Sequence, residues 1–270
     1  MKKILTVLVL LALVVSANLC RATILFSDNF DSYTDGALAG QGTWAQTAAA
    51  TPLLYVNSGL VYMTNGQDVY SPLTIPTTLA DGESVYFSFD VNVSTIVGTG
   101  DYFLHFTPNN GNTSLFYSRL FVRSNTVTGM YQLGWLGTSG GAATPTYGTT
   151  DLDLNTTYHV VMAYNYSSLN PTNASGAIYV NPTDPVEGNN TAYVPTTLWT
   201  ASGTTTPDTN SVAAVNLRQG GATSAPRLTL DNLVVATAFS DVVIVVPEPS
   251  AIVLASFGGL LLINYLRRKR

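Results

Sequence analysis

The acidic residues are the first candidates for chemistry, because glycosidases work with a pair of carboxyl groups held at a fixed separation. The chain has only three glutamates: Glu83 follows an Asp-Gly turn, Glu187 lies in a loop with proline and glycine, and Glu248 is near the C-terminus. Asp151 and Asp153 are the best pair, since alternate residues of a strand point to the same face. The alternative, which we favour, places both aspartates in a solvated turn.

Two other patterns match catalytic motifs only in part. Residues 137–141 read Gly-Thr-Ser-Gly-Gly, the spacing of a nucleophile elbow. That motif needs a helix after the serine, whereas Pro145 and the absence of helical periodicity indicate a flexible loop. His105 and His159 are the only histidines and lie within expected strands, so we expect packed or surface imidazoles. The sequence contains no zinc-ligand spacing or phosphate-binding loop, and we expect no catalytic residue.

Aromatic side chains are the other candidates, because ligand sites combine aromatic surfaces with a few well-placed polar groups. Tyr86 points away from the apolar side of its expected strand, and Trp135 lies near a loop, so both are predicted as glycan contacts. The alternative for each is core or cross-strand packing, which most strand aromatics adopt. Abundant Thr, Asn, Ser and Gly would give an uncharged polar surface suited to sugars.

Strands must hold these residues, because alternation with a period of two runs through the middle of the chain. In residues 84–93, valine and phenylalanine alternate with polar residues, and residues 158–166 repeat the pattern. Turn pairs such as Asn-Gly and Gly-Gly separate the segments, and no long window shows helical periodicity. The sequence predicts an all-β fold, a two-sheet antiparallel β-sandwich, as one domain over residues 23–240. The other expected strands are 23–26, 53–56, 60–63, 101–106, 115–122, 129–136, 177–180, 192–194, 212–218 and 227–235.

Charge is scarce and one-sided in this domain. Only 10% of the residues are charged, against about 25% in ordinary soluble domains. Residues 23–246 contain four arginines, no lysine and 15 acids, which gives a net charge of −11. Four scattered arginines cannot replace the counterions of a nucleic acid, so we exclude nucleic-acid binding. Disorder is disfavoured, because 46% of the residues are hydrophobic.

The first 22 residues have the composition of a secretory signal peptide. Two lysines precede an apolar stretch over residues 4–15, which is too short to span a bilayer. We expect export through the Sec machinery, with cleavage after Ala22 removing residues 1–22. Cleavage after Ala17 is the alternative. Cys20, the only cysteine, lacks the surroundings of a lipobox.

The C-terminal end has three parts in a fixed order. A linker over 241–249 carries a Pro-Glu-Pro motif, residues 250–266 are predicted as a short transmembrane helix, and a basic cluster over 267–270 is expected in the cytoplasm. Two prolines around one residue favour an extended segment at the membrane surface, which suits a protease. The residues of the motif are Val246, Pro247, Glu248, Pro249 and Ser250, and those of the basic end are Arg267, Arg268, Lys269 and Arg270.

This order of motif, apolar span and basic end resembles the PEP-CTERM sorting signal of exported proteins in Gram-negative, biofilm-forming bacteria. The resemblance implies recognition by exosortase, a membrane-embedded cysteine transpeptidase that cleaves near the motif. It also implies a precursor anchored in the inner membrane, whose domain then passes to the cell surface, outer envelope or extracellular matrix. The alternative is a plain single-pass membrane anchor.

The two ends of the domain, residues 26–44 and 217–237, resemble concanavalin A-like, laminin-G-like jelly-roll domains, as does the segment 154–166. The resemblance implies that the first and last strands pair. Such domains often hold a structural Ca²⁺ between these strands, and Asp28 and Asp231 are the matching positions. The alternative for Asp231 is an exposed or bulged strand residue.

These observations predict an exported, non-enzymatic protein with a structural or interaction role near exopolysaccharide in a biofilm matrix. The first alternative is a carbohydrate-binding adhesin module with a defined glycan. The second is a divergent glycoside hydrolase or lyase.

Overall fold

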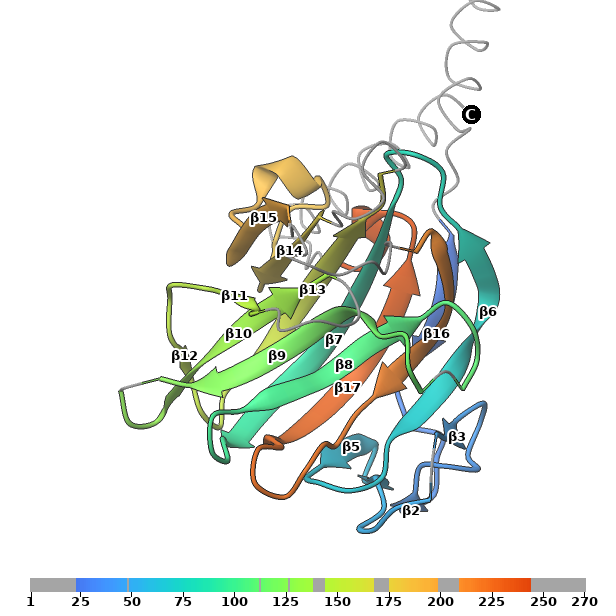
Figure 1. Ribbon diagram of the computed structural model, residues 1–270, viewed down its shortest axis with the longest axis vertical. Helices are drawn as coiled ribbons and strands as arrows, with labels where there is room; N and C mark the ends of the chain where they lie inside the picture. Colours follow the sequence, from blue (N-terminus) through green and yellow to red (C-terminus); the bar gives the residue numbers. More distant parts are fainter. Residues whose placement is uncertain are drawn as a thin grey trace, which may run out of the picture.

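The computed structural model describes residues 23–47, 49–111, 113–125, 127–137, 144–167, 175–198 and 209–243. In these ranges the chain forms two antiparallel β-sheets packed face to face, with two short 3-10 turns (Figure 1). The predicted all-β sandwich is confirmed. Residues 1–22 with the cleavage site at Ala22, Ser139, and residues 244–270 with the sorting motif, span and basic end lie outside the described part. None of the helical turns that are described could reach across a membrane.

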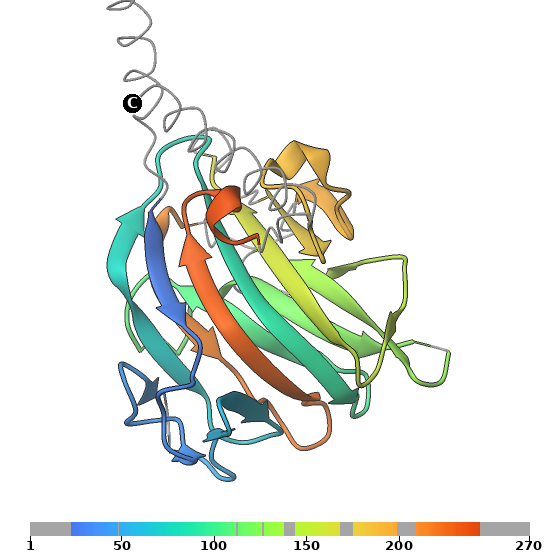
Figure 2. The same cartoon turned by 180° about the vertical axis from the view of Figure 1, so that it is seen from behind.

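Sheet A has nine strands in the order β15-β14-β13-β7-β17-β5-β4-β2, with β1 also paired to β17 (Figure 2). Their bounds are β1 Ile24–Asp28, β2 Gly36–Ala37, β4 Tyr55–Asn57, β5 Leu60–Met63, β7 Ser84–Thr95, β13 Thr157–Asn165, β14 Ser175–Val180, β15 Val194–Leu198 and β17 Arg227–Ala236.

Sheet B has eight strands in the order β11-β10-β9-β8-β16-β6-β3, with β12 also paired to β10. Their bounds are β3 Ala45–Gln46, β6 Val69–Thr78, β8 Asp101–Thr107, β9 Tyr117–Ser124, β10 Met130–Leu136, β11 Thr146–Tyr147, β12 Leu152–Asp153 and β16 Ser211–Leu217. The 3-10 turns are η1 Glu187–Asn189 and η2 Phe239–Asp241.

The first and last strands pair, as the resemblance implied. In the antiparallel ladder of β1 and β17, Phe26 lies opposite Val235 and Asp28 lies opposite Leu233. β17 also pairs with β7, so the two ends of the domain meet in the middle of sheet A.

β6 is the one long strand that the sequence analysis missed. It contains Pro72 and Pro76, and proline removes the backbone donor that a central strand needs. β6 tolerates them because β16 pairs along one side, whereas on the other side β3 covers only Val69 and Tyr70. The prolines therefore lie in a strand that is an edge over most of its length.

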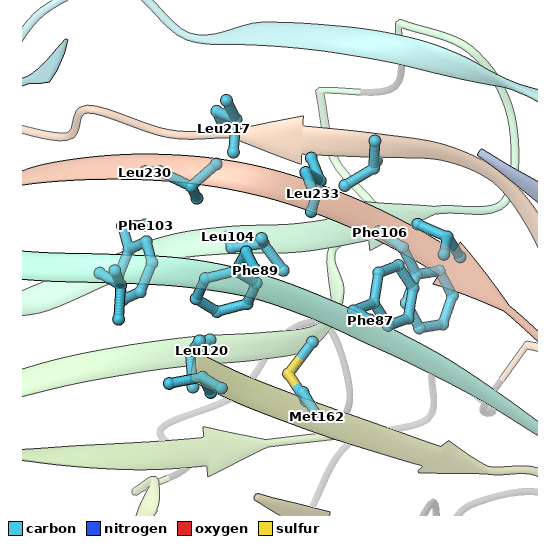
Figure 3. Packing of buried hydrophobic residues seen from close by; sticks show 14 of the residues in the cluster. Phe87, Phe89, Phe103, Leu104, Phe106, Leu120, Met162, Leu217, Leu230 and Leu233 are labelled. Carbon is cyan, nitrogen blue, oxygen red and sulfur yellow. The ribbon is translucent and has the colours of Figure 1, made fainter. Parts of the chain in front are cut away.

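Aromatic residues join the two sheets in the core (Figure 3). Phe87 of β7 stacks on Phe106 of β8, with ring centroids 5.7 Å apart and planes 8° from parallel. Phe89 of β7 meets Phe103 of β8 edge to face at 6.0 Å. All four side chains are fully buried, so this layer fixes the inward face of both sheets.

Residues 237–243, which we call the C-terminal strap, fold back over the outer face of sheet A (Figure 2). Phe239 packs edge to face on Tyr86 of β7 and Tyr179 of β14, with centroids 5.5 and 5.0 Å away. Val242 and Val243 are buried in the same cluster. The folded structure thus includes the start of the predicted linker.

His159 of β13 ties this strap to the sheet. Its Nδ1 lies 2.8 Å from an oxygen of Asp90, and its Nε2 lies 2.9 Å from the carbonyl oxygen of Val242. A carboxylate and a carbonyl both accept hydrogen bonds, so the two contacts together require both ring nitrogens to donate. The geometry therefore favours the imidazolium form of His159.

We expect the strap to loosen as the pH rises. Burial alone would lower the pKa of His159, but the hydrogen bond to Asp90, the bond to the Val242 carbonyl and the Asp90 charge raise it above its ordinary value. When the pKa of a histidine is raised by folding, its protonation stabilises the folded state fully at a pH below the unfolded-state pKa of about 6.5. This stabilisation is lost as the pH rises through the folded-state pKa. Hydrogen exchange at residues 239–243, corrected for the intrinsic rate, should be faster at about pH 9 than at about pH 6.

The matched variant is His159→Gln, which cannot carry the charge and should show fast strap exchange at both pH values. Burial would raise the pKa of Asp90, but its hydrogen bonds with His159 and Asn232 hold it below the ordinary range. Asp90 therefore stays ionised throughout this experiment. Equal strap protection in the wild-type protein at both pH values would contradict the idea that protonated His159 holds the strap.

Candidate functional site

Both aromatic residues predicted as glycan contacts are covered, which corrects that expectation. Trp135 has no exposed surface, and its indole Nε1 donates to Ser118 Oγ at 2.8 Å. Alternation along β10 places Trp135 on the inward face. Tyr86 is 8% exposed under the strap, and its hydroxyl donates to Glu187 at 2.7 Å. The packing alternative holds for both residues.

Asp28 anchors a hydrogen-bonded junction near the end of β1. Its Oδ1 accepts from the Phe30 amide at 2.9 Å, and its Oδ2 accepts from the Tyr33 hydroxyl at 2.6 Å and the Trp44 indole at 2.8 Å. Three donors therefore use most of the acceptor capacity of this carboxylate.

Asp231 lies at a bulge of β17 against β7, which is the alternative given for it above. Its Oδ1 accepts from the Asn232 amide at 2.7 Å. Burial raises its pKa, and the charges of Asp31, Asp90 and Asp28 raise it further. Within the described ranges, no three His, Cys, Asp or Glu side chains are grouped to hold a metal. The assignment of Asp28 and Asp231 as calcium ligands therefore stays a prediction, without a grouped ligand set in this part of the chain.

Sheet B lies on the near side in Figure 1. A row of aromatic side chains crosses its outer face. Tyr102 of β8 lies opposite Phe121 of β9, Phe121 lies opposite Gly134 of β10, and Gly134 lies opposite Tyr147 of β11. A Cβ atom at Gly134 would come within 2.6 Å of the Tyr147 ring. Glycine therefore makes room for that ring against the sheet.

Three of the four arginines of the domain lie on these rings. The Arg123 guanidinium carbon is 3.9 Å from the Tyr147 ring centroid, and that of Arg218 is 4.1 Å from Tyr102. Arg119 lies over the same Tyr102 ring at 5.4 Å. Stacking of this kind stabilises a cation and holds its planar donor group in one orientation.

Acidic and amide groups fix the guanidinium groups further. Arg218 Nη1 lies 2.8 Å from an Asp101 oxygen. Arg123 donates through Nε and Nη2 to Gln132 Oε1 at 3.0 and 2.7 Å, and Gln132 Nε2 donates to Asp151 Oδ1 at 2.9 Å. Burial opposes the charge of Arg218, but its hydrogen bond with Asp101 raises its pKa above the ordinary value. Asp151 thus acts as an acceptor on this face, while Asp153 is exposed in β12.

A pocket of about 310 Å³ opens beside these groups. His105 lies in its wall, 3% exposed, with its ring edge to face against Phe116 at 4.7 Å. Neither ring nitrogen of His105 has a hydrogen-bond partner. Burial, together with the charges of Arg218 and Arg119, lowers the pKa of His105 to about 3, so the ring is uncharged. The pocket is lined by Thr47, Ala50, Gly66, Asp68, Tyr102, His105, Thr113, Phe116, Asn216 and Arg218.

The arginines are not scattered, as their positions in the sequence suggested, because three of them gather on one face. One signal was available: Arg119, Phe121 and Arg123 alternate along β9, so they share a face. Arg218 could not be placed with them, because it lies about a hundred residues further on. Only the pairing of β8 with both β9 and β16 brings it to the same face.

No protein-family model and no curated protein sequence matches the chain. Several solved structures are similar to it at low identity. A mutant of alginate lyase Aly36B in complex with alginate trisaccharide has a TM-score of 0.48 and 16% identity, covering 78% of this chain and 96% of that one. The CBM2 module of Lactobacillus casei BL23 phage J-1 evolved Dit has a TM-score of 0.45 and 11% identity, covering 81% and 96%. The Emp47p carbohydrate recognition domain has a TM-score of 0.44 and 10% identity, covering 82% and 99%.

We expect Asp28→Asn to lower the free energy of unfolding by about 2–3 kcal/mol, because the amide loses part of the acceptor capacity that three donors use. Denaturant unfolding measures the change, and Asp153→Asn, at an exposed position, should stay within about 0.5 kcal/mol of the wild type. The loss should be equal in chelator and in calcium. A calcium-dependent rise in the wild-type midpoint that disappears in Asp28→Asn would show instead that Asp28 holds an ion.

Proposed function

We propose that this protein is an exported, non-enzymatic module that binds polysaccharide through the outer face of sheet B. The observation that carries the proposal is the convergence of Arg119, Arg123 and Arg218 on one aromatic row beside the pocket. On the outer face of sheet A, the strap packs over the aromatic residues Tyr86 and Tyr179. These two side chains therefore contact protein and are not open to a ligand.

Fixed donors and acceptors suit this role. Sugar hydroxyls both donate and accept hydrogen bonds. A site whose own donors and acceptors are already held in place loses little conformational freedom when a sugar binds. Here stacked guanidinium groups supply donors, while Asp101, Asp68 and Asp151 supply acceptors. The face is preorganised because ion pairs and ring contacts already hold the long side chains.

The non-enzymatic part of the proposal rests on the placement of the titratable groups. Cleavage of a polysaccharide needs a proton donor or acceptor within hydrogen-bond reach of the sugar. The imidazole of His105 is almost wholly covered by its neighbours, and the carboxylate of Asp101 is engaged with Arg218. These contacts support binding over catalysis.

Binding to a panel of soluble polysaccharides tests the site, with affinity electrophoresis as the measurement. We expect Arg218→Ala to weaken binding by about tenfold or more, since a charge-assisted hydrogen bond contributes about 1.5–3 kcal/mol. Ala50→Trp should fill the pocket and weaken binding without removing any polar contact. Tyr55→Ala and Val186→Trp are the matched controls, because both residues are exposed and Tyr55 lies on sheet A.

Two results would contradict the proposal. One is equal binding by Ala50→Trp and the wild type, which would move the site elsewhere. The other is release of shortened or unsaturated products from the same panel, which would make the protein an enzyme. Thermal unfolding of each variant confirms that a loss of binding is not a loss of folding.

The sorting part of the proposal rests on the sequence at the two ends. The protein would be exported through the Sec machinery, held in the inner membrane by residues 250–266, and cleaved by exosortase near Pro249 for release to the surface or matrix. The strap ends only a few residues before Val246, so the motif would follow the folded domain directly.

Mass spectrometry of the protein recovered from the cell surface tests this route. We expect an N-terminus at Thr23 and a C-terminus close to Pro249, with the residues that follow it removed. Recovery of a surface protein that still carries its basic end, Arg267 to Arg270, would contradict processing and favour a plain anchor.

A further inference from the structure

We propose that the ligand of the sheet B outer face is an uncharged, hydroxyl-rich polysaccharide and not a polyanion such as a polyuronate. This inference rests on the proposed function and names the class of polysaccharide. It follows from the partners of the arginines on this face, which are carboxylates and an amide of the same chain.

Carboxylates accompany two of the three arginines of this face. Arg218 is paired with Asp101 at 2.8 Å. Arg123 is linked through Gln132 to Asp151, with donor–acceptor distances of 2.7 and 2.9 Å. An acidic polymer would have to displace these carboxylates or lie against them, and like charges at close range repel each other.

Asp68 adds a third carboxylate, in the pocket wall beside Arg218. Its Oδ1 accepts from the Gln219 amide at 2.9 Å. With Arg119, Arg123 and Arg218 set against Asp68, Asp101 and Asp151, the face has equal numbers of positive and negative groups. The His105 ring in the same wall is neutral, so it adds no attraction for an anion.

The charge of the whole domain acts in the same direction. Residues 23–246 carry a net charge of −11, and the fourth arginine, Arg227, is exposed on β17 of the other sheet. A field of this sign slows the approach of a polyanion and does not affect a neutral polymer. Both the local pairing and the overall charge therefore select an uncharged ligand.

The test compares two neutral polymers, dextran and galactomannan, with two acidic polymers, alginate and polygalacturonate. Affinity is measured at about 20 mM and about 300 mM salt, since only charge-driven binding is strongly screened. We expect a neutral polymer to bind with less than a twofold change in affinity across this range. Neither acidic polymer should bind with comparable affinity at the higher salt.

Asp151→Asn provides the sharpest variant. Its amide oxygen can still accept from Gln132 Nε2, so the side-chain relay is kept while one negative charge is removed. We expect the ratio of the affinity for polygalacturonate to the affinity for the neutral polymer to rise by at least threefold at low salt in this variant. Asp81→Asn removes the same charge from an exposed turn and should show no such gain.

The outcomes separate this inference from the function it rests on. Wild-type binding to alginate or polygalacturonate that exceeds binding to both neutral polymers, falls with salt and is lost in Arg218→Ala would overturn the inference and leave the binding site in place. Binding of none of the four polymers would contradict the inference and the proposed function together. An equal gain in Asp81→Asn and Asp151→Asn would assign the effect to net charge and overturn the local pairing argument.

Discussion

The structure depends on one aromatic layer packed between the two sheets. Phe87 and Phe89 of β7 meet Phe106 and Phe103 of β8, and successive strand residues must then point to opposite faces (Figure 3). Filling the interior therefore decides which side chains remain for the outer surface. In β8 the pairing with β9 shifts register on both sides of Leu104, and Tyr102 and His105 contact each other on the outer face although they lie three residues apart.

The outer faces of the two sheets differ because the strap covers part of sheet A, whereas a pocket opens on sheet B. On sheet A, the C-terminal strap covers an apolar patch and His159 fastens it through Asp90 and Val242. On sheet B, guanidinium groups lie over the aromatic row and carboxylates hold them in place. On sheet A, the charged pair of His159 and Asp90 holds the strap against the sheet. On sheet B, the arginines and their carboxylates fix hydrogen-bond donors and acceptors beside the open pocket.

Local patterns in the sequence were enough to predict the sandwich, since alternation and turn pairs are properties of adjacent residues. They did not predict β6, because Pro72 and Pro76 are tolerated only at an edge that the pairing of other strands creates. The candidate site was harder still. Tyr86 was predicted from its outward direction and Trp135 from its nearby loop, but the strap covers Tyr86 and alternation turns Trp135 into the core. Arg218 reaches its partners through long-range strand pairing.

The central claim is that the outer face of sheet B binds polysaccharide. Hydrogen exchange of the full protein, measured with and without a neutral oligosaccharide that it binds, tests this most directly. We expect added protection in β8, β9 and β16 around the pocket, with sheet A and the strap unchanged. Protection confined to β7, β13 and β17 would contradict it, because those strands lie on the opposite side of the sandwich.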